Sequence, residues 1–228
     1  MPLTMGMLVA DKVPYYISSS NWGSTATTSS NTLTWSHTTT ADTTCLVIVS
    51  MWMDSSGHTT SNSADFNSTS LTRIRGNSVN ANQTVEIFRL FNPPIGTFNA
   101  RALYSGTVDR FGGAMAINLG GNITAVLSQN GGSSTTSATI TASLTTSRRS
   151  IVVMGGGGHN DVSGLPSISV TAPTGSSSAV QTSSNTSNSN GKRVSAFYSP
   201  LQSAGTFNAT GSFSSADNGR VFVAAAFG

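Results

Sequence analysis

Apolar and polar residues alternate along most of this chain, in short runs separated by clusters of Gly, Asn, Asp and Ser. The alternation is clearest over residues 97–105. An extended strand there would place on one face Phe98, Ala100, Ala102 and Tyr104, and on the other Asn99, Arg101 and Ser105. No segment longer than a turn or two has helical periodicity. The sequence therefore predicts an all-β protein.

Twelve strands are expected, six in each half of the chain. The first six span Thr32 to Thr38, Cys45 to Met53, Ser70 to Arg75, Thr84 to Phe91, Thr97 to Ser105 and Gly113 to Leu119. The second six span Ala138 to Ser143, Ser150 to Met154, Ser167 to Thr171, Arg193 to Tyr198, Thr206 to Ser214 and Arg220 to Phe227. This strand spacing is typical of a sandwich.

The two halves repeat one another. Gly-Thr-Phe-Asn-Ala occurs at 96–100 and again at 205–209, and Thr32–Thr39 and Leu46–Val49 are similar to Thr139–Thr146 and Ile151–Met154. We predict a two-sheet, jelly-roll-like sandwich over residues 31–228, built from half-repeats of about 31–120 and 137–228. One continuous unit is preferred to two domains, because Ile123 to Leu127 is too apolar for a free linker. The expected core equivalents are Phe98, Phe207, Tyr104 and Phe213.

Residues 1–30 do not join the repeat and are expected to form an extended N-terminal arm. A terminal segment this apolar usually packs on its own domain or on a neighbour. The candidate partner contacts are Leu3, Met5, Met7, Leu8, Tyr15, Tyr16 and Trp22.

Two stretches have low complexity. Gly155–Gly158 ends a strand, and the expectation is a hinge, a bulge or a place of close backbone approach. The run Ser176–Asn190 is nearly all Ser, Thr and Asn and is expected to be a long mobile loop.

Composition predicts a polar but weakly charged surface. The chain has 39 serines and 31 threonines, and only 8% of its residues are charged. The net charge is +3, but the eleven basic residues are scattered, whereas binding to nucleic acid requires a cluster that neutralises several phosphates. No signal peptide or transmembrane segment is evident. We therefore expect neither a nucleic-acid nor a membrane partner, and synthesis in a cytoplasm.

The residues that could carry chemistry form no catalytic or metal-binding pattern. Most Asp residues stand in turn-like contexts, and Glu86 is expected to be a solvent-facing partner of Arg89. His159-Asn160-Asp161 supplies too few ligands for a metal site, and Cys45 is expected to be a small core residue. We therefore expect no enzyme activity, cofactor or metal; glycoside hydrolysis by two carboxylates brought together in a sandwich is a remote alternative.

Four segments of the chain carry a family resemblance in combination: Trp35 to Thr39, Cys45 to Ser50, Ser70 to Ile74 and Val85 to Thr97. With the distinctive corner Asn92-Pro93-Pro94-Ile95-Gly96-Thr97, they resemble a β-sandwich family that recurs in bacteriophage virion proteins and related bacterial surface proteins. The similarity covers about residues 30–228. The chain departs from the family pattern at Phe88 and Phe91, where Trp and Tyr are usual. The resemblance implies a structural or binding module without catalysis, and no functional residue carries over.

Together these features predict a non-enzymatic virion protein. We expect a capsid decoration or cement protein, a homo-oligomer with a trimer favoured, which contacts the major capsid protein or other virion proteins and stabilises the shell through subunit-bridging contacts. The alternative is a tail or head-fibre module that binds host-surface carbohydrate. In that case the Ser, Thr and Asn side chains would hydrogen-bond the sugar.

Overall fold

The computed structural model describes residues 16–25, 31–53, 62–79, 83–105, 111–158, 168–171, 180–187, 192–213 and 219–228. Within these ranges the chain consists of strands in antiparallel sheets, and no helix occurs. The prediction of an all-β protein is therefore confirmed.

The strands of the first half form two sheets. The first inner sheet contains, in spatial order, β1 (Tyr16–Thr25), β9 (Phe111–Gly120), β3 (Thr43–Met53), β7 (Gln83–Phe91) and β6 (Thr72–Val79). The first outer sheet contains β2 (Thr32–Thr39), β8 (Gly96–Leu103), β4 (Ser63–Phe66) and β5 (Thr69–Ser70).

The strands of the second half form two more sheets. The second inner sheet contains β10 (Val126–Ser134), β17 (Arg220–Phe227), β12 (Ser150–Gly158), β15 (Lys192–Gln202) and β14 (Val180–Ser187). The second outer sheet contains β11 (Thr139–Thr146), β16 (Gly205–Phe213) and β13 (Ile168–Thr171). The expectation of two sheets is therefore wrong, because the described strands form four.

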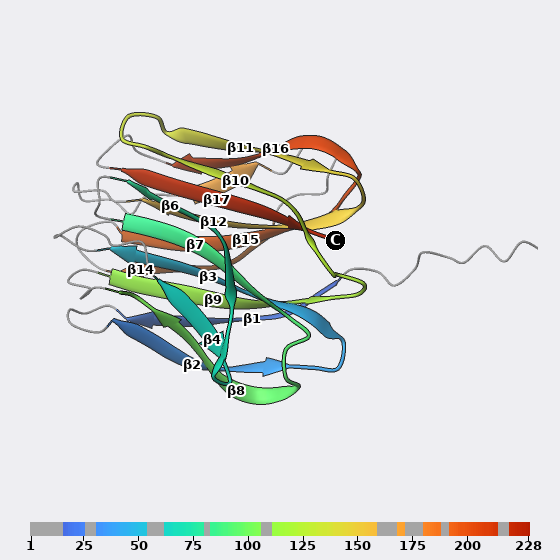
Figure 1. Cartoon of the computed structure of the whole chain (residues 1–228). Coiled ribbons are helices and arrows are strands. Elements are labelled where there is room, and N and C mark those ends of the chain that lie inside the picture. The colour runs from blue at the N-terminus through green and yellow to red at the C-terminus, as the bar shows by residue number, and fades with distance from the viewer. Residues whose placement is uncertain are drawn as a thin grey trace, which may run out of the picture.

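Three buried apolar clusters stack these sheets in four layers, with the inner sheets face to face and an outer sheet beyond each (Figure 1). Strand β3 illustrates how an inner strand serves two clusters. Val47 and Val49 point into the central cluster between the inner sheets, and Leu46 and Ile48 point toward the first outer sheet. Because successive side chains of a strand face opposite sides, an inner strand that is covered on both faces, such as β3, is apolar at nearly every position.

The outer strands are apolar on one side only. Residues along β11 are alternately exposed and buried, with Ile140, Ala142 and Leu144 inside. The same alternation runs along β2, where Leu33 and Trp35 are inside. One face of each outer sheet is therefore left to solvent.

Glycines in β12 allow the two inner sheets to approach closely. A Cβ atom on Gly155 would lie 2.5 Å from Cγ1 of Val49 and 3.0 Å from Cγ1 of Val85, and one on Gly157 would overlap Sδ of Met51. Such distances leave no room for a side chain. Of the alternatives for Gly155–Gly158, close backbone approach is the one observed.

The two inner sheets follow the same strand order. In each of them a long strand, β3 or β12, lies between the last strand of its half and the strand that begins at Gln83 or Lys192. The outer pairs also share a register, with Thr39 opposite Gly96 and Thr146 opposite Gly205. Gly96 and Gly205 adopt φ angles of 135° and 136°, values that residues with a side chain avoid.

Two segments differ from their predicted form. Tyr16–Thr25 is strand β1, paired with β9, so this part of the predicted arm belongs to the first inner sheet. Val180–Ser187 is strand β14, paired with β15, although the Ser- and Thr-rich sequence predicted a mobile loop. In both cases pairing with a neighbouring strand satisfies backbone N–H and C=O groups, and composition alone does not predict this pairing.

The predicted core residues are largely confirmed. Tyr104, Phe207 and Phe213 are buried, and Phe98 is partly buried against the first outer cluster, with its ring 5.6 Å from that of Phe66. Ile123, in the connection between the halves, is buried in the central cluster. That connection is therefore part of the core, as its apolar sequence predicted.

Candidate functional site

The predicted partner contacts lie mostly beyond the part of the chain that the structure describes. Leu3, Met5, Met7, Leu8 and Tyr15 fall outside the described residues. Tyr16 and Trp22 lie in β1, where they are opposite Gly120 and Met115 of β9. Of the seven predicted contacts, the described part of the chain therefore places only Tyr16 and Trp22, at separate positions along one strand.

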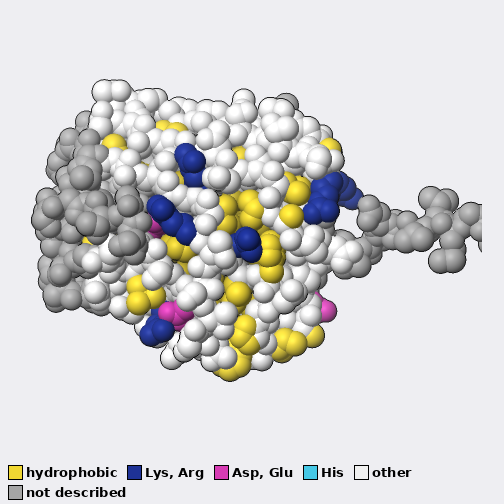
Figure 2. Space-filling view, viewed as in Figure 1, with side chains coloured by type: hydrophobic (Ala, Val, Ile, Leu, Met, Phe, Trp, Pro, Cys, Tyr) yellow, Lys and Arg dark blue, Asp and Glu magenta, His cyan; other side chains and the backbone are white. Residues whose placement is uncertain are grey.

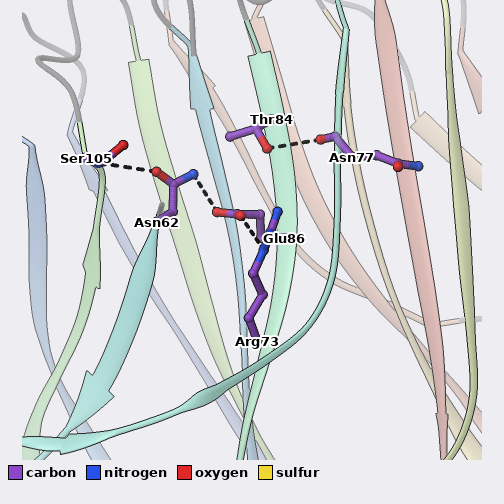
Figure 3. A network of polar contacts seen from close by, with 6 residues as sticks. All are labelled: Asn62, Arg73, Asn77, Thr84, Glu86 and Ser105. Carbon is purple, nitrogen blue, oxygen red and sulfur yellow. Dashed lines mark hydrogen bonds and ion pairs between the residues drawn. The ribbon is translucent and has the colours of Figure 1, made fainter. Parts of the chain in front are cut away.

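A buried carboxylate occupies one end of the first half (Figure 3). Glu86 of β7 is fully buried, with Nε of Arg73 2.7 Å from its Oε1 atom and Nδ2 of Asn62 donating to its Oε2 atom at 2.6 Å. The backbone N–H of Ser105 donates in turn to Oδ1 of Asn62 at 3.3 Å. This network joins β6 and β7 of the inner sheet to residues that flank β4 and β8 of the outer sheet.

Glu86 is therefore not the solvent-facing partner of Arg89 that the sequence suggested. Burial raises the pKa of Glu86, although the hydrogen bond from Asn62 and the guanidinium of Arg73 lower it in part. The sequence does contain a signal for burial, because Phe88 and Leu90 share the face of β7 that carries Glu86. Both carboxylate oxygens contact protein groups and the side chain has no exposed surface, so its role is to tie strands together.

His37 forms a second buried polar contact between layers. Its Nε2 atom lies 2.8 Å from Oδ1 of Asn118, and Nδ2 of Asn118 donates to the carbonyl of Thr38 at 2.8 Å. Burial lowers the pKa of His37, and the hydrogen bond with Asn118 opposes this effect. The imidazole thus links β2 to β9 as a neutral group.

Cys45 is a core residue, as expected. It is fully buried in the central cluster, and burial raises the pKa of its thiol to about 12. A thiol that stays protonated and inaccessible has neither the charge nor the exposure of a reactive cysteine.

The outer faces of the two outer sheets carry matching sets of hydroxyl and amide groups. On the first outer sheet Ser36 is opposite Asn99 and Thr38 is opposite Thr97, and these four exposed residues are here named the first quartet. On the second outer sheet Ser143 is opposite Asn208 and Thr145 is opposite Thr206, and these four exposed residues are named the second quartet. In both sheets the threonine hydroxyls bond across the strands, at 2.8 Å and 3.0 Å.

Charges near these faces are few. On the first outer sheet Arg101 donates from Nε to Oδ1 of Asp65 at 2.8 Å, and its Nη2 atom lies 2.8 Å from Oδ2. The sequences of β11 and β16 contain no charged residue. The face of the molecule in Figure 2 is mostly uncharged polar surface, with Lys and Arg as separate groups and apolar patches among them.

No candidate metal or membrane site emerges from the described part of the chain. Its His, Cys, Asp and Glu residues form no group of three that could hold a metal ion. Among the same residues there is no helix with the length and hydropathy that a membrane crossing requires.

Comparisons with known proteins identify no relative. No family model matches the chain, and neither a curated protein nor a solved structure matches it. The resemblance to the phage sandwich family therefore stays an expectation drawn from the sequence.

Proposed function

We propose that this chain is a non-enzymatic structural protein of a bacteriophage particle, a capsid decoration or cement protein that stabilises the shell. In this proposal it is made in the host cytoplasm and incorporated into the virion. Its partners are the major capsid protein or other virion proteins and further copies of itself, with a trimer as the favoured oligomer.

The finer fold assignment is part of this proposal. Each half is a jelly roll, the two halves are a duplication, and residues 1–15 serve as the docking arm. The strand path supports this assignment, since the chain crosses repeatedly between the two sheets of the first half, and the orders β1-β9-β3-β7, with β6 added at the edge, and β2-β8-β4-β5 are those that two Greek keys produce. The corresponding inner order in the second half, and the matching φ angles of Gly96 and Gly205, support the duplication.

The observation that carries the functional proposal is the set of three buried apolar clusters that pack all four layers against one another. The inner sheets share a central cluster that includes Val49, Val153 and Val223, and Gly155 brings their backbones close. Fully burying such a side chain contributes about 1.5 to 3 kcal/mol, so many of them together resist separation of the halves. The two outer faces are thereby held apart at a fixed spacing, which suits a block that bridges neighbouring subunits.

The test removes the proposed arm and measures the particle. The deletion has to stop before Tyr16, because β1 begins there and belongs to the first inner sheet. The variant lacking residues 2–15 should unfold cooperatively like the full chain but fail to enter particles. Particles without the protein should release their genome at a lower temperature than complete particles.

A matched control supplies the full-length protein to particles assembled without it, which should restore their thermal stability. Full incorporation of the truncated chain together with unchanged particle stability would overturn the cement proposal. If particle stability is unchanged but adsorption to the host falls, the fibre-module alternative is favoured instead. The specific observation in favour of that alternative is the pair of quartets on the outer sheets.

A further inference from the structure

The two quartets are the same four residue types at the same register. In each, a Ser faces an Asn and a Thr faces a Thr across an antiparallel pair, and all eight side chains are exposed. The inward-facing residues agree on one strand of each pair, where Phe98 and Ala100 of β8 correspond to Phe207 and Ala209 of β16. They differ on the other strand, where β2 has Trp35 and His37 and β11 has Ala142 and Leu144. Exposed positions usually change more readily than buried ones, so the agreement of the exposed Ser and Thr of β2 with those of β11, beside buried residues that differ, calls for a reason outside the core.

The two asparagines strengthen the argument for an external ligand. Asn99 lies in β8 opposite Ser36 of β2, just beyond the pairing of β8 with β4, and Asn208 lies in β16 opposite Ser143 of β11, just beyond the pairing of β16 with β13. Asparagine is depleted in strands, so keeping it there costs stability. Within the described residues, neither Asn side chain makes a hydrogen bond that would compensate. Binding an external ligand would account for both.

The chemistry of a quartet fits an uncharged ligand rich in hydroxyl groups. In the Thr38–Thr97 and Thr145–Thr206 pairs one hydroxyl donates to the other, which leaves one donor and several acceptor positions facing solvent. The Asn amide adds two donors and one acceptor. Side chains two apart on a strand are about 7 Å apart and opposite ones about 5 Å, an area comparable to one sugar ring.

Charge points to the same class of ligand. The strands β11 and β16 carry no charged residue, and on the first outer sheet Arg101 is paired with Asp65. An anionic ligand would find no free cation within either quartet.

We propose that each outer sheet binds a neutral glycan at its quartet, so that one chain has two equivalent sites on opposite faces. This activity goes beyond the shell-stabilising role proposed above, and a purified chain is enough to test it, so either proposal can fail alone. Because each site lacks an aromatic platform, single-site affinity is low. Two sites on opposite faces compensate for this low affinity, because one chain can bind a polymer at both sites at once.

The experiment is native electrophoresis of the purified chain through gels containing dextran, mannan or galactomannan, with polygalacturonate as the anionic comparison. The chain should be retarded by at least one neutral polysaccharide and not by polygalacturonate. Asn99→Ala or Asn208→Ala alone should weaken the retardation at least twofold, and the double variant should abolish it. The wild type should also cross-link the retarding polysaccharide and make it turbid, whereas each single variant should bind without turbidity.

Thr141→Val is the matched control. Thr141 forms a threonine pair with Thr210, at 3.2 Å, on the same face but outside the second quartet. It should therefore leave retardation unchanged, while Thr145→Val should reduce it without loss of folding.

Three results would overturn the proposal. The first is migration unaffected by every neutral polysaccharide, and the second is equal retardation of the wild type and the double Asn variant. The third is a change in native mass of the double variant without sugar, which would mean that the quartets join copies of the chain.

Discussion

The packing of the inner sheets makes Gly155 a sensitive position. An alanine there would place its Cβ atom 2.5 Å from Cγ1 of Val49 and 3.0 Å from Cγ1 of Val85. Valine is stiff about χ1, so neither methyl group can turn away and the two sheets must separate locally. Overpacking of this kind costs about 1 to 3 kcal/mol, which exceeds the gain of about 0.5 to 1 kcal/mol that alanine brings to an open strand.

Urea unfolding of Gly155→Ala should therefore give a lower midpoint with an unchanged slope. The control is Gly157→Ala, where the closest contacts of the added methyl group are with the flexible end of Met51 and Cγ2 of Val85 is farther away, at 3.3 Å, so the loss should be smaller. Combining Gly155→Ala with Val49→Ala should cost less than the sum of the single losses, by about 0.5 to 3 kcal/mol. If Gly155→Ala proves neutral or stabilising, or strictly additive with Val49→Ala, the inner sheets do not pack at this spacing.

Three further predictions address single groups. Because burial raises the pKa of Glu86 above its ordinary 4.5, the folded chain binds this proton more tightly than the unfolded chain. The difference in unfolding free energy between the wild type and Glu86→Gln should thus favour the wild type most below pH 4.5 and decrease as the pH rises through the pKa of Glu86 in the folded chain. Urea titrations at a series of pH values measure this difference, and a constant value would contradict the prediction. Cys45, with its pKa raised to about 12, should resist iodoacetamide at pH 8 in the native chain and react fully in denaturant, as measured by mass spectrometry, whereas rapid native labelling would contradict its burial. Gly205→Ala should lower the unfolding free energy by about 1 to 3 kcal/mol from backbone strain alone, since its φ is 136° and a Cβ there would touch nothing; an unchanged midpoint would contradict the strain.

The sequence predicts individual strands well because alternation is a local property. All twelve predicted strands are present, with boundaries shifted by a few residues at most in the majority of cases. The strands it missed include β1 and β14, whose residues are mostly polar or mixed. They are edge strands of the inner sheets, and pairing with one neighbour does not require an apolar face.

The number of layers was harder to predict because it depends on how whole sheets stack. Runs such as Cys45 to Val49 and Val221 to Phe227 are apolar at every position. A strand in a two-layer sandwich has one solvent face, so uninterrupted apolar runs indicate sheets covered on both sides. The sequence contains this signal, but the prediction of a two-sheet sandwich rests on the alternation within single strands, which does not depend on the number of layers.

The polar contacts could largely not be predicted from the sequence, for a related reason. Glu86 contacts Asn62, which precedes β4, and Arg73, which lies on β6, and no local spacing in the sequence predicts that these residues meet. The quartets are different, since Ser36, Asn99 and their counterparts recur in the repeat itself. The sequence alone does not show that these residues are exposed or that they pair across strands. These two properties make the repeated Gly-Thr-Phe-Asn-Ala part of a candidate binding surface. On β2 and β11 the exposed Ser and Thr residues agree while the residues that face the core differ, and a shared ligand explains this agreement more readily than shared packing does.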